Sequence, residues 1–164
     1  MTAIYIDADA CPVREEVLRV AMRRRLAVHI VSNGSRPIRP PAQADVHMVI
    51  VPAEPDAADD WIAERVGPSD ICVTADIPLA SRCLRAGARA VAPDGHVWTE
   101  ANIGAALAGR EVSRHLRELG LSAGGGKALS KQDRSAFLNA LDALVTAAQR
   151  TRVAINLRPP PGSG

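Results

Sequence analysis

Short apolar runs alternate with amphipathic stretches along the first 92 residues of this chain. The apolar runs have the length of buried strands, and turn-forming residues follow most of them. The stretches between them repeat apolar residues at helical spacing, as Val13, Val17 and Val20 do. This pattern predicts strands over residues 4–6, 27–31, 46–51, 70–74 and 88–92, and helices over residues 13–25, 55–66 and 78–86.

The alternation predicts an α/β fold with three layers. A mostly parallel five-stranded sheet should carry helices on both faces, and its strands should all end at one edge. After Thr99 the pattern becomes helical, which adds C-terminal helices over residues 100–119 and 131–149, the second opened by a capping box of Ser130 and Asp133. We expect one domain over residues 1–150 and a disordered tail over residues 151–164.

Composition and charge narrow the function classes. The net charge of +2 and the 2% aromatic content predict neither a large basic surface nor a platform for stacked bases. Affinity for nucleic acid would then come from local Arg and Lys contacts to phosphate. Three widely spaced cysteines are typical of free thiols. With no signal peptide and no apolar run of about 18 residues, the sequence predicts a cytoplasmic protein and no membrane span.

Two carboxylates follow the first predicted strand. Asp7 and Asp9 are two residues apart, so in extended backbone both side chains leave the same face. Ligands of open α/β sheets bind outside the carboxyl ends of strands, where a cation, a proton or a helix N-terminus must relieve the repulsion of two acids. The pair therefore indicates a Mg²⁺ or Mn²⁺ site, or a helix cap beside a solvated turn residue.

Further acids are expected at the same edge. Asp76 follows the fourth strand, although it could also cap the next helix. Asp56 suits the first turn of a helix electrostatically, and Asp94 suits a turn. One of Asp59 and Asp60 should point toward the sheet edge, with Asp59 narrowly favoured. Oxygen ligands select Mg²⁺ or Mn²⁺, and the candidate metal ligands are Asp7, Asp59, Asp60 and Asp76.

Five ordered blocks make the chain recognisable. They read IDADACPV at residues 6–13, PDAADDWI at 55–62, VTADIPLA at 73–80, WTEANI at 98–103 and SKQDRSAF at 130–137. Together they resemble the YaiI/YqxD family of uncharacterised bacterial proteins, over about residues 3–148. That family is similar to PIN-like nuclease domains, in which acids at the C-terminal sheet edge hold one or two Mg²⁺ or Mn²⁺ ions and hydrolyse a phosphodiester.

The resemblance implies roles for particular residues. Asp7, Asp76 and one of the Asp59–Asp60 pair would be catalytic and metal-binding. Asp9 belongs to the family's own signature and would bind metal through water or orient the first carboxylate. Asn33, after the second strand, would be a polar neighbour in the cleft.

Basic residues are the candidate contacts to substrate phosphate. Lys127, Lys131 and Arg134 could meet a phosphate backbone or simply form a solvated helix start, and the sequence favours neither. Four arginines flank the predicted acidic edge, although each alone is more typical of a surface charge; they are Arg14, Arg36, Arg39 and Arg82.

The first hypothesis for function is a metal-dependent nuclease with RNA as its expected substrate. The second is a haloacid-dehalogenase-like phosphatase with Asp7 as nucleophile, Asp9 as general acid and Ser32 at the phosphate-binding strand end. The absence of any lysine before Lys127 and the helical position of Asp59 oppose it. The third is a non-catalytic module that binds RNA or protein.

Overall fold

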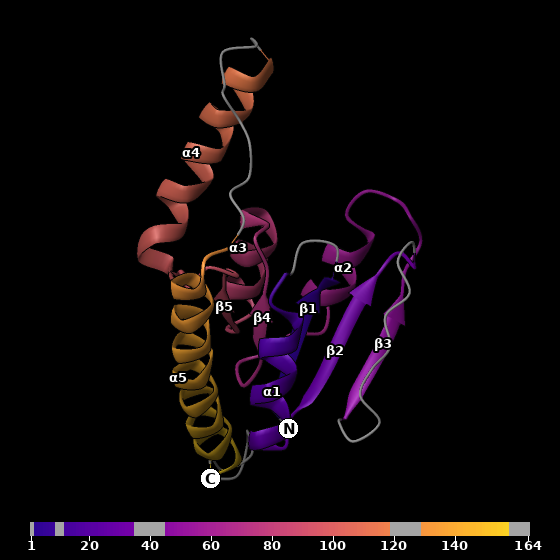
Figure 1. Cartoon of the computed structure of the whole chain (residues 1–164), viewed down its shortest axis with the longest axis vertical. Helices are drawn as coiled ribbons and strands as arrows, with labels where there is room; N and C mark the ends of the chain where they lie inside the picture. The colour runs from indigo at the N-terminus through magenta and orange to yellow at the C-terminus, as the bar shows by residue number, and fades with distance from the viewer. Residues whose placement is uncertain (1, 9–11, 35–44, 119–128, 158–164) are drawn as a thin grey trace, which may run out of the picture.

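A six-stranded sheet forms the middle layer of the computed structural model, which describes residues 2–8, 12–34, 45–118 and 129–157 (Figure 1). The strand order is β3-β2-β1-β4-β5-β6. The first five strands pair in parallel and β6 is antiparallel. The strands are β1 (Ala3–Asp7), β2 (Ala27–Ser32), β3 (Val46–Ile50), β4 (Ile71–Val73), β5 (Arg89–Val91) and β6 (Val97–Trp98).

The α/β class and the mostly parallel sheet are confirmed, but the expected strand number is wrong. All five predicted strands form, and β6 is added to them. Because β6 contains only Val97 and Trp98, it is too short to show an alternating pattern in the sequence.

The strand order reverses at β1, the first strand in the chain. Along β1, Tyr5 is in register with His29 of β2 on one side and with Cys72 of β4 on the other. The chain adds β2 and β3 on one side of β1 and then crosses over to add β4 and β5 on the other side. Such a reversal leaves a crevice at the carboxyl ends of the strands, where α/β proteins bind ligands.

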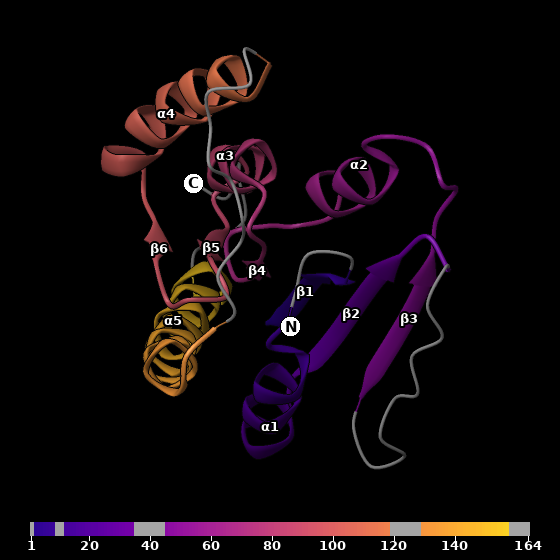
Figure 2. The same ribbon diagram turned by 45° about the horizontal axis from the view of Figure 1, so that its top comes forward.

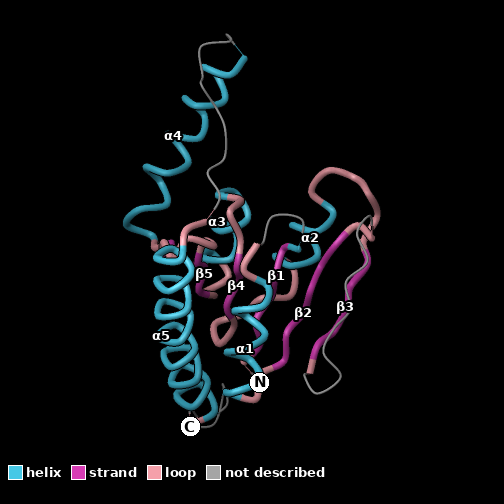
Figure 3. Tube along the Cα trace, viewed as in Figure 1, coloured by secondary structure: helices cyan, strands magenta, loops and turns pink. Residues whose placement is uncertain are grey.

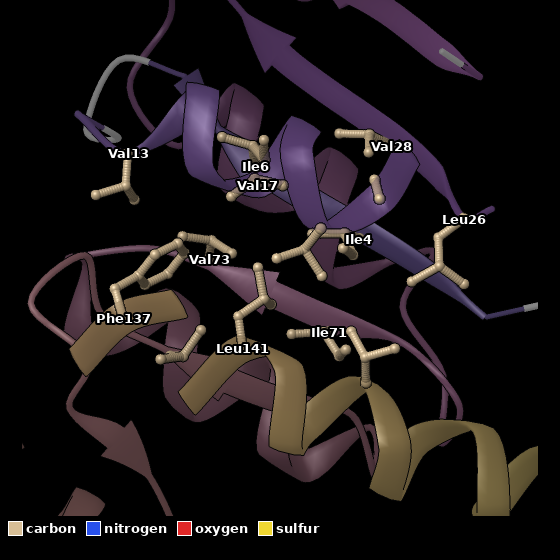
Figure 4. Close-up of a cluster of buried hydrophobic side chains, with 14 of the residues drawn as sticks. Ile4, Ile6, Val13, Val17, Leu26, Val28, Ile71, Val73, Phe137 and Leu141 are labelled. Atoms are coloured by element: carbon tan, nitrogen blue, oxygen red, sulfur yellow. The ribbon is translucent and has the colours of Figure 1, made fainter. Parts of the chain in front are cut away.

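Helices α1 (Arg14–Arg24) and α5 (Lys131–Asn156) cover one face of the sheet (Figure 2). Figure 4 shows the core between them, where Phe137 and Leu141 of α5 point toward the side chains of β1 and β4. Phe137, Leu141 and Val145 are spaced four residues apart along α5, and all three are buried. The capping box of Ser130 and Asp133 is present. These contacts make α5 part of the main core.

The helix α5 continues to Asn156, so the expected start of a disordered tail at residue 151 is wrong. Val153, Ala154 and Ile155 extend the helix, and they are good enough helix residues to continue it without being buried. The rest of the expected tail, residues 158–164, lies outside the described residues.

Helices α2 (Ala57–Ala63) and α3 (Ile77–Arg85) cover the opposite face (Figure 2). Ile62 of α2 and Leu79 of α3 are fully buried in this second core. Cys72 and Cys83 are buried free thiols there, as expected, and Cys11 lies outside the described residues. The two faces of the sheet are therefore both covered.

Helix α4 (Glu100–Glu118) contacts α3 and extends away from the sheet (Figures 1 and 3). Its start is fixed by a reciprocal pair, in which the Thr99 N–H donates to Asn102 Oδ1 and the Asn102 N–H donates to Thr99 Oγ1. Among the described residues, the helices all fall short of the length and apolar character that crossing a membrane requires.

Candidate functional site

An open pocket of about 370 Å³ lies at the edge of the sheet where the parallel strands end. Its wall is formed by residues that follow the strands and by the start of α2. Acidic side chains dominate its polar surface. The lining residues are Asp7, Asn33, Val51, Pro52, Ala53, Glu54, Pro55, Asp56, Ala58, Asp59 and Asp76.

Four neighbouring strands contribute to this pocket. Asp7 is the last residue of β1 and is only 7% exposed. Asn33 follows the end of β2, Val51 follows β3, and Asp76 follows β4. Because these strands are parallel, their ends meet at one edge, which is how residues 69 positions apart in the sequence (76 − 7) reach one pocket.

Asp76 has a structural role as well as a place in the pocket. Its Oδ1 accepts the N–H of Leu79 at 3.0 Å and so caps α3, and its own N–H donates to Thr74 Oγ1 at 2.9 Å. The cap interpretation from the sequence is therefore correct. A carboxylate has two oxygens and about four acceptor positions, so a cap leaves acceptor capacity for a second ligand.

Asp56 and Asp59 enter the pocket from the start of α2. Asp56 is the N-cap residue with φ = 67°, and its side chain makes no capping hydrogen bond. The left-handed backbone is uncommon for residues other than glycine but is tolerated by Asp. Sequence reasoning assigned Asp56 to the helix dipole alone and gave Glu54 no role, because the turn that brings both to the pocket has no periodic signal.

The other acids of the pocket affect the pKa of the Asp59 carboxyl group. Burial, which is the largest cause, and the negative charges of Asp76, Asp7 and Asp56 together raise its pKa from 3.8 to about 6, whereas Arg82 acts in the opposite direction. The pocket thus concentrates negative charge around a carboxyl that is partly removed from water. A proton or a cation relieves such an arrangement.

Asp60 faces a different environment from its neighbour Asp59. Its Oδ1 is 2.7 Å from Nη1 of Arg82, in an ion pair between α2 and α3, and it is not among the residues that line the pocket. The choice that the sequence left open between these two acids therefore falls on Asp59 as the pocket residue. Arg82 is correspondingly engaged with Asp60.

The donor set suits a hard divalent cation, since carboxylate and amide oxygens are the ligands of Mg²⁺ and Mn²⁺. Within the part of the chain that the structure describes, however, no three His, Cys, Asp or Glu side chains are close enough together to hold a metal ion. Asp9, which was expected to bind metal through water or to orient the Asp7 carboxylate, lies outside the described residues. The oxygen atoms that line the pocket are therefore of the kind that binds Mg²⁺ or Mn²⁺, but the described acids do not form a complete set of metal ligands.

Of the candidate substrate-contacting residues that the structure describes, Asn33 lines the pocket, whereas Arg14, Arg82, Lys131 and Arg134 do not. Arg134 donates from Nη1 to Glu16 Oε1 at 2.9 Å and to the Pro12 carbonyl at 3.4 Å, which ties α5 to α1. Arg14 is the half-buried first residue of α1, and Lys131 is the exposed first residue of α5. Lys127, Arg36 and Arg39 lie outside the described residues.

Comparison with known proteins identifies the family. The family model described as "Uncharacterized BCR, YaiI/YqxD family" matches residues 5–147. The chain belongs to the YaiI/YqxD family. Three of the blocks that carried the resemblance, at residues 6–13, 55–62 and 73–80, each supply an acid to the pocket.

Relatives in this family match over nearly their whole length. A UPF0178 protein of Parvibaculum lavamentivorans is 55% identical over 161 residues, which cover 98% of this chain and all of the relative. UPF0178 proteins of Rhodospirillum rubrum and Caulobacter vibrioides are 52% and 50% identical, over 91% and 92% of this chain and 99% and 97% of the relatives. No solved structure matches the chain.

The turn at Asp94 lies apart from the pocket. Its Oδ1 accepts the N–H of His96 at 3.0 Å, and the following Gly95 has φ = 94°. The interpretation of Asp94 as a turn residue is confirmed. Because Asp94 does not line the pocket, it is a suitable acid for control substitutions.

Proposed function

We propose that this protein is a divalent-cation-dependent phosphodiesterase, a nuclease that cleaves RNA in the acidic pocket at the sheet edge. The observation that carries the proposal is that Asp7, Asp59 and Asp76, from three different elements, line one pocket. PIN-like nucleases, to which the YaiI/YqxD family is similar, use acids at the same edge of a parallel sheet. This correspondence supports a hydrolase over a purely structural role for the acids.

Each acid has a defined part in the proposed reaction. A bound Mg²⁺ or Mn²⁺ would lower the pKa of an attacking water and neutralise charge on the phosphate. Asp7, held rigidly at the end of β1, and Asp76, held by its cap on α3, would fix the cation between two elements. Asp59, whose pKa is near 6, would accept a proton from the water at neutral pH. Asp56 and Asn33 would contact the substrate or the cation shell.

The pocket acids would move closer together when a cation binds. Because the described acids do not form a preformed shell, a bound cation would have to draw them together and offset their mutual repulsion. The lining residues 52–56 join β3 to α2 and contribute two further acids, Glu54 and Asp56. This loop is the segment best able to move the acids of α2 toward Asp7 and Asp76.

The phosphatase hypothesis receives less support from the site. It requires Ser32 to bind phosphate, but Ser32 is buried, accepts the N–H of Gly34 at 3.3 Å, and is not among the lining residues. It also uses Asp59 and Asp60 as a metal pair, whereas Asp60 is engaged with Arg82. A trapped aspartyl-phosphate on Asp7 would nevertheless restore it.

Isothermal titration with MnCl₂ and MgCl₂ tests the site directly. The unmodified protein should bind Mn²⁺, and Asp59→Asn and Asp76→Asn should each weaken binding at least about tenfold, since each removes one negative charge from the pocket that attracts the cation. Asp60→Asn and Asp94→Asn are matched controls that change one acid each outside the pocket. Thermal unfolding of every variant establishes that loss of binding is not loss of fold.

Cleavage of a 5′-labelled single-stranded RNA then tests the chemistry. Activity should require Mn²⁺ or Mg²⁺, disappear with EDTA and with Asp59→Asn, and survive Asp60→Asn. Absence of cation binding, or binding that both pocket variants leave unchanged, would overturn the metal-dependent mechanism. Cation and RNA binding without cleavage would replace the nuclease with a binding module.

A further inference from the structure

A ladder of stacked rings crosses the sheet on the face that carries α2. Tyr5 of β1, His29 of β2 and His47 of β3 are aligned by the strand register. Their ring centroids are 4.7 Å apart between Tyr5 and His29 and 5.0 Å apart between His29 and His47, with interplanar angles of 18° and 21°. The three rings therefore form one continuous stack from the core to the outer part of the sheet.

Trp61 and Arg65 of the α2 segment stand over this ladder. The Trp61 ring is tilted against Tyr5 and His29, with centroids 6.1 and 6.0 Å apart. The guanidinium of Arg65 lies 4.1 Å from the centre of the Trp61 ring, and its Nη1 donates to the Trp61 carbonyl at 3.0 Å. The Trp61 ring therefore lies against the ladder, and the positive charge of Arg65 lies on the Trp61 ring.

The outer part of this assembly is open to solvent, while its inner part is fixed. Tyr5 is buried, whereas the His47 side chain is 53% exposed and the Arg65 side chain is 44% exposed. Asp45 Oδ1 lies 2.7 Å from Nε2 of His47 and holds the orientation of that ring. The structure therefore presents a ring of fixed direction at the surface, although rings are scarce in this chain.

The ladder lies on the same face of the same strands as the acidic pocket. In a strand, residues two or four apart share a face, which relates Tyr5 to Asp7, His29 to Asn33 and His47 to Val51. At about 3.3 Å per residue, these pairs are about 7–13 Å apart along the strands. A few linked nucleotides span such a distance.

Helix α2 lies close to both the acidic pocket and the ring ladder. Ala58 lines the pocket, Trp61 is three residues further along, and Arg65 is four residues beyond Trp61. This spacing puts Ala58 and Trp61 on one side of the helix, with Arg65 just past its end. Helix α2 thus lies beside both the pocket and the ladder, and Val49 and Val51 of the chain segment between His47 and the pocket pack into the core under this helix.

We propose that the exposed ring of His47 stacks a base of a single-stranded nucleic acid whose backbone leads into the acidic pocket, with the half-buried Trp61 beside the bound strand. The inference rests on the proposed function for the direction of the strand, and it adds the substrate class: a single strand with unpaired bases. Base faces are hidden in a duplex, whereas any unpaired base offers a π-face to such rings. Arg65 would meet a backbone phosphate just past the end of α2.

Quenching of Trp61 fluorescence by short oligomers tests this surface. Trp98→Phe leaves Trp61 as the only tryptophan, and it removes a buried indole N–H that has no hydrogen-bond partner in the structure. The probes are a ten-nucleotide oligo-U RNA, the oligo-dT equivalent, an abasic oligomer of equal length, and a duplex. Measurements at pH 8 with EDTA exclude cation binding and cleavage.

The base-bearing single strands should quench Trp61 and bind at least about fivefold more tightly than the abasic oligomer and the duplex. His47→Ala should weaken their binding by a similar factor, whereas His96→Ala, which removes a histidine elsewhere, should not. Tighter binding of either the RNA or the DNA oligomer supports the proposal and adds a sugar contact. Equal binding of abasic and base-bearing strands, or an unchanged His47→Ala variant, would overturn it.

The pocket variants separate this inference from the proposed function. In EDTA, Asp59→Asn should keep base-dependent quenching, because the stacking rings do not involve the acids. If Asp59→Asn keeps quenching while the unmodified protein binds no cation, the stacking surface stands and the nuclease mechanism fails. If cation binding and cleavage occur without base-dependent quenching, the nuclease stands and the stacking surface is wrong.

Discussion

Asp60 and Arg82 form an ion pair of 2.7 Å that joins α2 to α3, immediately beside the acidic pocket. The two helices carry Asp59 and Asp76, so this pair connects the elements that supply two pocket acids. Arg82 also lowers the pKa of Asp59 through space, against the larger effects of burial and of the other acids. A residue outside the pocket thereby adjusts the charge inside it.

Arg82→Ala should raise the pKa of Asp59 above its value of about 6, because it removes a positive charge that lowers this pKa. NMR titration of the Asp59 side-chain carbon measures the shift. Asp60→Asn is the control, since it breaks the ion pair but keeps the Arg82 charge, and it should not raise the pKa. An Asp59 pKa that is the same in Arg82→Ala and in the unmodified protein would contradict this role of Arg82.

Asp59→Asn should stabilise the protein near pH 7.5. The folded pKa of about 6 is above the unfolded value of 3.8, so the folded state binds more protons between these pH values. The stability that Asp59 provides is therefore present below about pH 4 and is lost as the pH rises through 6. Urea unfolding from pH 4 to 8 should show a gain for the variant at high pH that shrinks toward pH 4. A gain of equal size at pH 4, or the same pH profile in Asp94→Asn, would contradict it.

Gly95→Ala should destabilise the protein by about 2–3 kcal/mol. A Cβ at Gly95 would lie 2.8 Å from the carbonyl carbon of Ala136 and 2.9 Å from the nitrogen of Phe137, and the φ of 94° disfavours any side chain. Gly104→Ala in α4 is the opposite case, because a Cβ there meets nothing within 4 Å, and it should be neutral or stabilising by up to about 1 kcal/mol. Urea unfolding measures both variants, and the free energy of unfolding of Gly104→Ala should exceed that of Gly95→Ala by at least about 2 kcal/mol.

Arg134→Met tests whether this arginine serves the fold or the substrate. Glu16 is 11% exposed at its side chain and its Oε2 is buried without a partner, so losing Arg134 should cost about 1–3 kcal/mol of stability. The double variant with Glu16→Met should recover most of this loss, because no buried charge remains. Unchanged stability together with weaker RNA binding would instead return Arg134 to the phosphate-binding role.

Most of the fold could be predicted from the sequence, because the periodic pattern of apolar residues within each segment indicates whether that segment forms a helix or a strand. The five parallel strands, α1 and α3 agree with their expected ranges to within a few residues, and Asp7 and Asp76 were expected at this edge from topology alone. The limits of α5 and the strand β6 were missed, since exposed apolar residues such as Val153 still continue a helix and two residues make no pattern.

Contacts between distant segments could not be read in the same way. The pairing of Asp60 with Arg82 decides that Asp59 is the pocket acid, but a helical pattern places both acids near the sheet with little difference. The engagement of Arg134 by Glu16 spans 118 residues. The ring ladder depends on strand register and includes two histidines, so the count of aromatic residues gave no indication of it.

The central place of β1 also affects how the chain folds during synthesis. Although β1 emerges from the ribosome first, it acquires its second neighbour only when β4 is made, at residues 71–73. The core under α2 and α3 draws on residues up to 88, whereas the opposite core needs Phe137 and later residues of α5. A nascent chain can therefore form the acidic pocket while the other face of its sheet still exposes apolar side chains, and exposed apolar surface of this kind promotes aggregation during synthesis.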